Sequence, residues 1–242
     1  MFLLICGCGG ATSSPVDSIR DSAQSKPDRQ INRDEAPFNA ESNRAAVAAW
    51  HTSQDPSHPL QTIEVFPVPD ASEFCLAICD HQLRWWGIFG LYRLEEGHVV
   101  WQASCEEKPT EQSVHWLRGL KLAGFTRPII EVYGQTHMGN GSLYLYELRN
   151  QTLVLLLQTR AVDSHWGDGE TFQGGRLMSE YTDLSGDGIA DLLLKGEVEK
   201  RSNDGDAVVA KHPCEKAFLW NIATNKFEED RSRRIGLSET DN

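Results

Sequence analysis

An acidic nine-residue stretch has the residue pattern best suited to chemistry in this sequence. Oxygen-bearing side chains stand at its first, third, fifth and ninth positions, and Gly188 permits a sharp turn between them. Hard oxygen ligands at alternate positions suit Ca²⁺, which accepts about 6–8 of them in loose geometry. The pattern therefore predicts a calcium loop. Its expected ligands are Asp183, Ser185, Asp187, the carbonyl of Ile189, and Asp191.

A metal-free turn is the alternative interpretation of the same residues. Asp, Ser and Gly favour tight turns without any cation, because their side chains bond to nearby backbone groups. Against this, three carboxylates in so short a loop repel one another unless a cation or a proton relieves them. Calcium is the favoured hypothesis, and its expected role is to stabilise the loop rather than to catalyse a reaction.

The flanks and the end of the loop distinguish it from an EF-hand. At the twelfth position an EF-hand has a bidentate Glu, and here Leu194 stands there. The loop instead resembles the D-x-[DN]-x-D-G-x-x-D-[LIV] loop of FG-GAP and VCBS repeats, as in the integrin α-subunit propeller. This resemblance implies a loop that joins the first two strands of a propeller blade and holds calcium. Ser185 replaces the usual Asp or Asn, and the Phe-Gly and Gly-Ala-Pro signatures are missing.

Short apolar segments must position this loop. From about Thr62 onward, runs of four to seven residues rich in aliphatic and aromatic side chains alternate with Gly, Asn, Asp and Pro. Such spacing predicts many short strands joined by turns. The expected fold class is all-β, built from repeated four-stranded antiparallel meanders that resemble propeller blades. Three such units are fewer than the ~4–8 blades of a closed propeller, so we expect an open or incomplete arrangement.

The spacing of these runs repeats. Residues 63–104 fall on 117–158 at a shift of 54 without a gap, and a third copy follows at a shift of 62. After an insertion of twelve residues the shift becomes 74. We therefore expect three units, at about 62–104, 116–159 and 177–230, in a β domain over 59–236 with a tail at 237–242. In the second unit the positions of the calcium ligands have lost their carboxylates, and they hold Lys121, Ala123, Phe125 and Ile129.

The first residues, MFLLICGCGG, resemble the lipobox of bacterial lipoproteins. In that family the Cys after a small residue is lipidated, which implies Cys8 here and a location at the bacterial cell envelope, lipid-anchored or secreted. The apolar run is shorter than the ~7–15 residues of a full signal, so residues 1–8 are interpreted as a truncated one. Residues 9–58 are poor in large apolar side chains and predict a flexible tether, with one or two helical turns at Ala45–Trp50.

Four cysteines lie outside the signal, and this even number is compatible with two disulfides in an oxidising compartment. Cys75 and Cys79 would lie about 13 Å apart along one strand, too far to pair with each other. Cys79–Cys105 is the pairing to test first, because both residues are expected at the same edge of the first meander. Zinc is disfavoured, since no second cysteine pair completes a tetrahedral site.

The remaining evidence concerns function. A net charge of −12 without Lys and Arg clusters argues against nucleic acid as a partner. The main hypothesis is a non-catalytic binding or scaffold module, with protein or glycan partners at the cell envelope and membrane contact through the lipid anchor only. One alternative is a small hydrolase that uses His165 and Asp168 in the 163–170 loop, and another is a purely structural lipoprotein.

Overall fold

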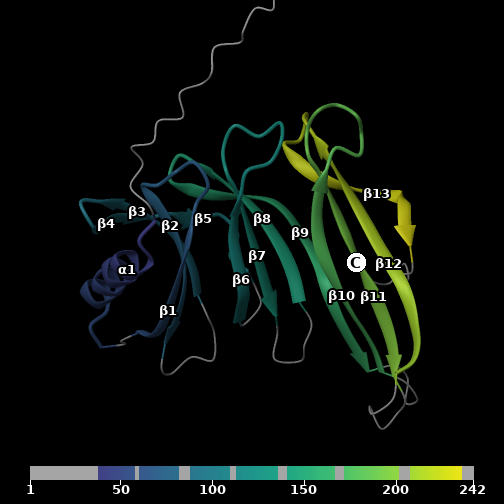
Figure 1. Ribbon diagram of the computed structural model, residues 1–242, viewed down its shortest axis with the longest axis horizontal. Coiled ribbons are helices and arrows are strands. Elements are labelled where there is room, and N and C mark those ends of the chain that lie inside the picture. Colours follow the sequence, from purple (N-terminus) through teal and green to yellow (C-terminus); the bar gives the residue numbers. More distant parts are fainter. Residues whose placement is uncertain are drawn as a thin grey trace, which may run out of the picture. The chain divides into compact units, whose positions relative to one another are not determined.

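The computed structural model describes residues 38–57, 60–81, 88–109, 113–135, 141–166, 172–201 and 208–235. The predicted lipidation residue, Cys8, lies outside these ranges, as do residues 9–37 of the predicted tether and the tail. Over the described residues the fold consists of antiparallel strands and one helix (Figure 1). The predicted all-β class is therefore confirmed.

The first part of the fold is a helix and a four-stranded antiparallel meander with the strand order β1-β2-β3-β4. Helix α1 lies against this sheet, next to β1 and β4. Its elements are α1 (Ala40–Gln54), β1 (Leu60–Pro67), β2 (Phe74–His81), β3 (Ile88–Glu95) and β4 (His98–Gln102).

Two further meanders share one continuous sheet, whose strand order runs from β13 to β6. The second meander comprises β6 (Ser113–Leu120), β7 (Ile129–Gln135), β8 (Gly141–Arg149) and β9 (Thr152–Trp166). The third comprises β10 (Phe172–Thr182), β11 (Asp191–Arg201), β12 (Val208–Asn221) and β13 (Lys226–Ile235). The short β5 (Ser104–Cys105) pairs with β9 in parallel. Strands β9 and β10 pair only over Val162–Trp166 and Phe172–Arg176, so the two meanders are joined at one end.

The strand spacing follows the shifts found in the sequence. Each strand of the second meander begins within one residue of the position 54 places after its counterpart in the first. Strand β11 begins 62 places after β7, and β13 begins 74 places after β9. The shift increases between β11 and β13, because β11 and β12 are longer than their counterparts β7 and β8. The described strands therefore form three four-stranded meanders.

The second meander is packed on both faces. Ile130 and Val132 of β7 enter the apolar cluster shared with the first meander, while Ile129 and Tyr133 enter the cluster shared with the third. Because both faces of β7 are buried, its sequence does not alternate between apolar and polar side chains. This packing of one meander on another positions the Glu131 cluster and the two cavities described below.

Helix α1 extends further than the sequence indicates. The Asn39 side chain accepts a hydrogen bond from the backbone N–H of Ser42 (3.0 Å) and caps its start. Val47 is fully buried against the first sheet, in a cluster with Cys75, Cys79 and Tyr92. Residues 40–54 are therefore folded rather than part of the predicted tether. Among the described residues, no helix is both long enough and apolar enough to cross a membrane.

The outer face of the third meander is charged. On the side opposite the shared core, Lys195 pairs with Glu180 (3.0 Å) and Lys211 pairs with Glu197 (3.5 Å). All four side chains are about half exposed. Exposed pairs of this kind contribute little stability, about 0–1 kcal/mol each, but they keep the face polar.

Candidate functional site

The predicted calcium loop connects β10 to β11, which are the first two strands of the third meander. Gly186 and Gly188 adopt positive φ angles of 80° and 84°. A side chain at either position would be strained, so glycine allows the turn. The loop therefore stands at the place in a meander that the family resemblance implies.

Asp183 holds the turn together from its first position. Its Oδ1 accepts hydrogen bonds from the backbone N–H groups of Gly186 (2.6 Å) and Asp187 (3.2 Å), and its Oδ2 accepts one from Gly188 (2.8 Å). These bonds lower the pKa of Asp183, the one from Gly188 most strongly. The carboxylate is therefore charged at neutral pH.

Asp191 fixes the other end of the loop. The residue is fully buried, and its Oδ2 accepts the backbone N–H groups of Leu184 (2.8 Å) and Ser185 (3.0 Å). Its Oδ1 accepts the backbone N–H of Trp220 (2.8 Å) on β12. A single carboxylate thus ties the start of the loop to a strand on the far side of β11.

The remaining predicted ligands lie at the surface of this turn. Asp187 is exposed, and its Oδ1 accepts the backbone N–H of Ile189 (2.8 Å). The donor set has the hard oxygens that calcium prefers. Within the described ranges, however, no three His, Cys, Asp or Glu side chains are grouped so that they could hold a metal. As the structure stands, the carboxylates point to backbone N–H groups, and calcium binding would require Asp183 and Asp187 to turn toward a common centre.

The loop also contacts the corresponding turn of the second meander. The backbone N–H of Ala190 donates to the carbonyl of Ala123 (2.9 Å). Gly124 has a φ of 81°, and a Cβ there would lie 2.8 Å from Ile189. A side chain at Gly124 would therefore clash with Ile189, and it would also strain the backbone because φ is positive there.

The predicted Cys79–Cys105 disulfide is not formed, and both thiols are free. Cys79 faces helix α1 in the cluster with Cys75 and Tyr92, whereas Cys105 packs against the cluster between the first and second meanders. Successive side chains of a strand point to opposite faces. The two sulfurs thus lie on opposite sides of the first sheet, which explains why they do not pair.

The buried thiols predict a loss of stability at alkaline pH. Burial raises the pKa of Cys75 to about 12 and that of Cys79 to about 11, from an ordinary value of 9.0. The unfolded chain therefore loses these protons first, and stability present below pH 9 is lost as the pH rises toward the folded pKa values. We expect up to about 1.4 kcal/mol per pH unit from each thiol above pH 9.

Urea unfolding at pH 8, 9 and 10 measures this slope. The double variant C75A/C79A should be less stable at neutral pH but should have a clearly shallower alkaline slope than the wild type. An equal slope in both proteins would contradict the assignment.

The loop of the hydrolase hypothesis is only partly described. Residues 163–166 end strand β9, and 167–170, which include Asp168, lie outside the described residues. The side chain of His165 is likewise not described. The hydrolase hypothesis is therefore untested by this structure.

A buried polar cluster that the sequence analysis did not anticipate joins the second and third meanders. Glu131 of β7 is fully buried, and its Oε1 accepts hydrogen bonds from Arg118 Nε (2.7 Å) and Trp116 Nε1 (3.1 Å). Its Oε2 accepts one from the hydroxyl of Tyr181 on β10. Arg118 Nη2 also donates to Ser179 Oγ on β10 (2.8 Å). Burial, and then the charge of Glu131, raise the pKa of Tyr181 well above its usual value.

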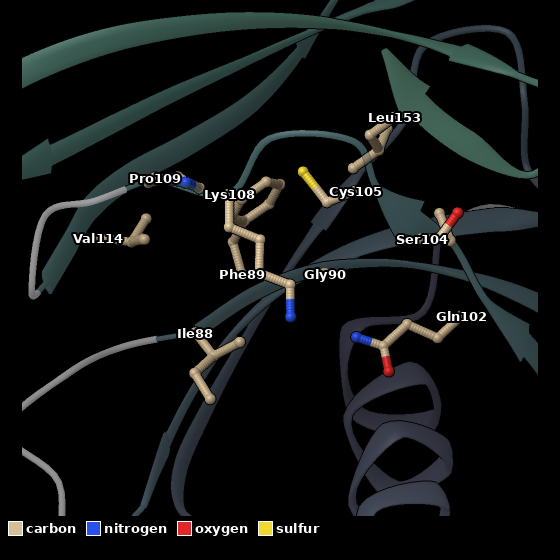
Figure 2. A pocket seen from close by; sticks show the side chains of 11 residues that line it. Ile88, Phe89, Gly90, Gln102, Ser104, Cys105, Lys108, Pro109, Val114 and Leu153 are labelled. Atoms are coloured by element: carbon tan, nitrogen blue, oxygen red, sulfur yellow. The ribbon is translucent and has the colours of Figure 1, made fainter. Parts of the chain in front are cut away.

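A cavity of about 520 Å³ lies between the first and second meanders. Figure 2 shows Cys105 and Phe89 near Lys108, with Ile88 and Gln102 below them in this view. Cys105 Sγ donates to the carbonyl of Glu107 (3.1 Å), and burial raises its pKa. A protonated thiol is a poor nucleophile, so this cavity lacks an activated cysteine.

A second cavity of about 410 Å³ lies between the same two meanders. Its walls come from the β1–β2 turn, β3, β4 and the ends of the β7–β9 strands. They comprise Val68, Ala71, Glu73, Phe74, Leu91, Arg93, Trp101, Arg127, Pro128, Ile130, Leu148, Asn150 and Gln151.

Comparison with known proteins gives no relative for this chain: no family model, no curated protein and no solved structure matches it. The FG-GAP/VCBS resemblance therefore remains a prediction from the loop and the strand spacing.

Proposed function

We propose that this chain is a non-catalytic binding or scaffold module of the bacterial cell envelope, lipid-anchored at Cys8 or secreted, and that calcium stabilises its third meander. The observation that carries the proposal is the position of the Asp183–Asp191 loop, which joins the first two strands of the third meander. Its turn is fixed by hydrogen bonds of its own, and it presents two carboxylates, Asp183 and Asp187, near the surface. A protein or glycan at the envelope surface would be the partner.

Each residue of the loop would have a distinct part in this function. The side chains of Asp183, Ser185 and Asp187 and the carbonyl of Ile189 are the groups that calcium would bind. Asp191 is the fifth predicted ligand, and it would act mainly by fixing the turn, because it is buried and accepts three backbone N–H groups. Calcium would offset the repulsion between the nearby carboxylates and so stabilise the folded loop.

The thiols of three described cysteines are not activated as nucleophiles. Cys75, Cys79 and Cys105 all have pKa values raised chiefly by burial, so they are protonated at neutral pH. Location is a separate part of the proposal. Fractionation of cells that produce the wild type and a C8S variant tests it, because only the wild type should be retained with the membranes by a lipid on Cys8.

Thermal unfolding with calcium or with a chelator tests the loop. A ligand at about 100 times its Kd adds about 2.7 kcal/mol, which for a chain of this size raises Tm by roughly 5–10 °C. We expect such a rise with calcium and its reversal by chelator. An unchanged Tm under both conditions would end the calcium proposal.

Two single substitutions make the test specific. Asp187→Asn removes one exposed carboxylate of the loop, and it should abolish most of the calcium-dependent rise in Tm. Asp70→Asn alters an exposed carboxylate in the β1–β2 turn, where the first meander has no calcium pattern. This control should keep the full rise, and an equal loss in both variants would indicate non-specific binding of calcium to an acidic surface.

A further inference from the structure

The second cavity is open to solvent and has an aliphatic floor. Val68, Leu91 and Ile130 are buried and belong to the cluster between the first and second meanders. Phe74 and Trp101 stand beside them in an edge-to-face pair with ring centroids 5.7 Å apart. These described residues offer an apolar surface on which an apolar body could lie.

The rim of the same cavity carries two guanidinium groups. Arg93 comes from β3 and Arg127 from the segment before β7, so they approach from different meanders. Arg93 Nη2 pairs with Glu95 (2.9 Å), and Arg127 Nη1 donates to the carbonyl of Leu148 (3.4 Å). Each guanidinium has five N–H donors, so both retain donors beyond these bonds. Among the described lining residues, Glu73 is the single acidic one.

The two arginines stand beside Glu73 in the lining, and Arg93 is also paired with Glu95, in a chain whose net charge is −12. Arginine binds carboxylates through two parallel N–H···O bonds, which gives both affinity and orientation. The aliphatic floor of Val68, Leu91 and Ile130 offers no hydrogen bonds to an occupant, and the polar groups Asn150, Gln151 and Trp101 Nε1 also line the cavity. An occupant with an apolar chain and one carboxylate fits both features at once.

We propose that this cavity binds a small aliphatic carboxylate, with its chain on the floor formed by Val68, Leu91 and Ile130 and its carboxylate at Arg93 and Arg127. The other cavity between the same meanders offers Lys108 as the one cation among its lining residues. A lysine binds as a point charge and lacks the paired donors of arginine. The proposal is independent of calcium, because the loop at Asp183–Asp191 contributes no residue to this cavity.

Isothermal titration of the full chain with octanoate tests the proposal. We expect saturable binding with a Kd below about 1 mM, and hexanoate should bind roughly tenfold more weakly because it buries two fewer methylene groups. Octanol should bind more weakly than octanoate, since it lacks the carboxylate. No saturable binding of octanoate up to about 10 mM would overturn the proposal.

Charge-removing variants locate the site. R93Q and R127Q should each weaken octanoate binding about tenfold and leave octanol binding unchanged, because each variant loses charge-assisted hydrogen bonds to the carboxylate. The side chain of Arg93 is 42% exposed and Arg127 is exposed, so both variants should fold, and their Tm values verify this. K108Q in the other cavity is the matched control and should bind octanoate like the wild type. Loss of binding in K108Q, or full affinity in both arginine variants, would overturn the assignment.

Discussion

Replacing Glu131 with alanine is expected to lower the free energy of unfolding by about 3 kcal/mol. The carboxylate is fully buried and accepts hydrogen bonds from Trp116, Arg118 and Tyr181. Removing one partner of a buried ion pair costs about 3–5 kcal/mol, because the other charge is left uncompensated. The lower end applies here, since the Arg118 side chain is 49% exposed and water can solvate it.

The size of this effect should depend on what replaces the carboxylate. Glu131→Gln keeps one oxygen for Arg118 and Trp116 and places an amide opposite the Tyr181 hydroxyl, so we expect a loss of only about 1 kcal/mol. Urea unfolding followed by circular dichroism measures both variants. A double-mutant cycle with R118Q isolates the ion pair from the tyrosine contact. A change below about 0.5 kcal/mol in E131A would show that the cluster does not hold the two meanders together.

The second large effect is expected at Asp191. Asp191→Ala removes the acceptor of three backbone N–H groups, those of Leu184, Ser185 and Trp220. Each buried donor left without a partner costs about 1–3 kcal/mol. Because the two loop amides can reach water when the loop opens, we expect a total loss of about 3 kcal/mol.

The matched comparison for Asp191 is Asp187→Asn in the same loop. Asp187 is exposed and its Oδ1 accepts one backbone N–H, from Ile189, so its substitution without calcium should cost less than about 1 kcal/mol. Unfolding in the presence of a chelator separates these effects from metal binding. If D191A and D187N were equally stable under chelator, Asp191 would not be the anchor of the turn.

The strands could be predicted because local signals for them agree. Hairpin turns recur where the chain needs positive φ angles, as at Glu96 with Gly97 and at Asn150 with Gln151. Apolar runs lie between such turns, and they recur at shifts of 54, 62 and 74. The order and class of the β elements follow from these local features, whereas strands β9 to β13, of 10 to 15 residues, are longer than the predicted runs of four to seven.

Helix α1 was harder to predict because it buries very little. Only Ala46 and Val47 are buried in it, so its sequence lacks the apolar stripe of a typical amphipathic helix. The partners of Glu131 were hidden for another reason. A charged residue inside the run Ile129–Tyr133 signals a buried partner, but Tyr181 lies fifty positions further along the chain. Tyr181 reaches Glu131 only because the third meander packs against the second.

The cysteine pairing was wrong because it depended on side-chain direction. Cys79 has the same parity along β2 as Cys75 and Ala77, which face the helix. A proposal based on strand ends alone cannot distinguish the two faces of the sheet. The second cavity could not be predicted from the sequence either, because its walls come from segments of two meanders that touch only in the folded state.

Helix α1 and the charged outer face of the third meander have a joint consequence for assembly. A stack of similar sheets has no inherent end, because each apolar face that it exposes can receive another sheet. Here Val47 and its neighbours cover the outer apolar face of the first sheet, and the pairs Lys195–Glu180 and Lys211–Glu197 keep the opposite face polar. The two outer faces are thus covered differently: helix α1 packs on the first sheet, and ion pairs cover part of the third meander.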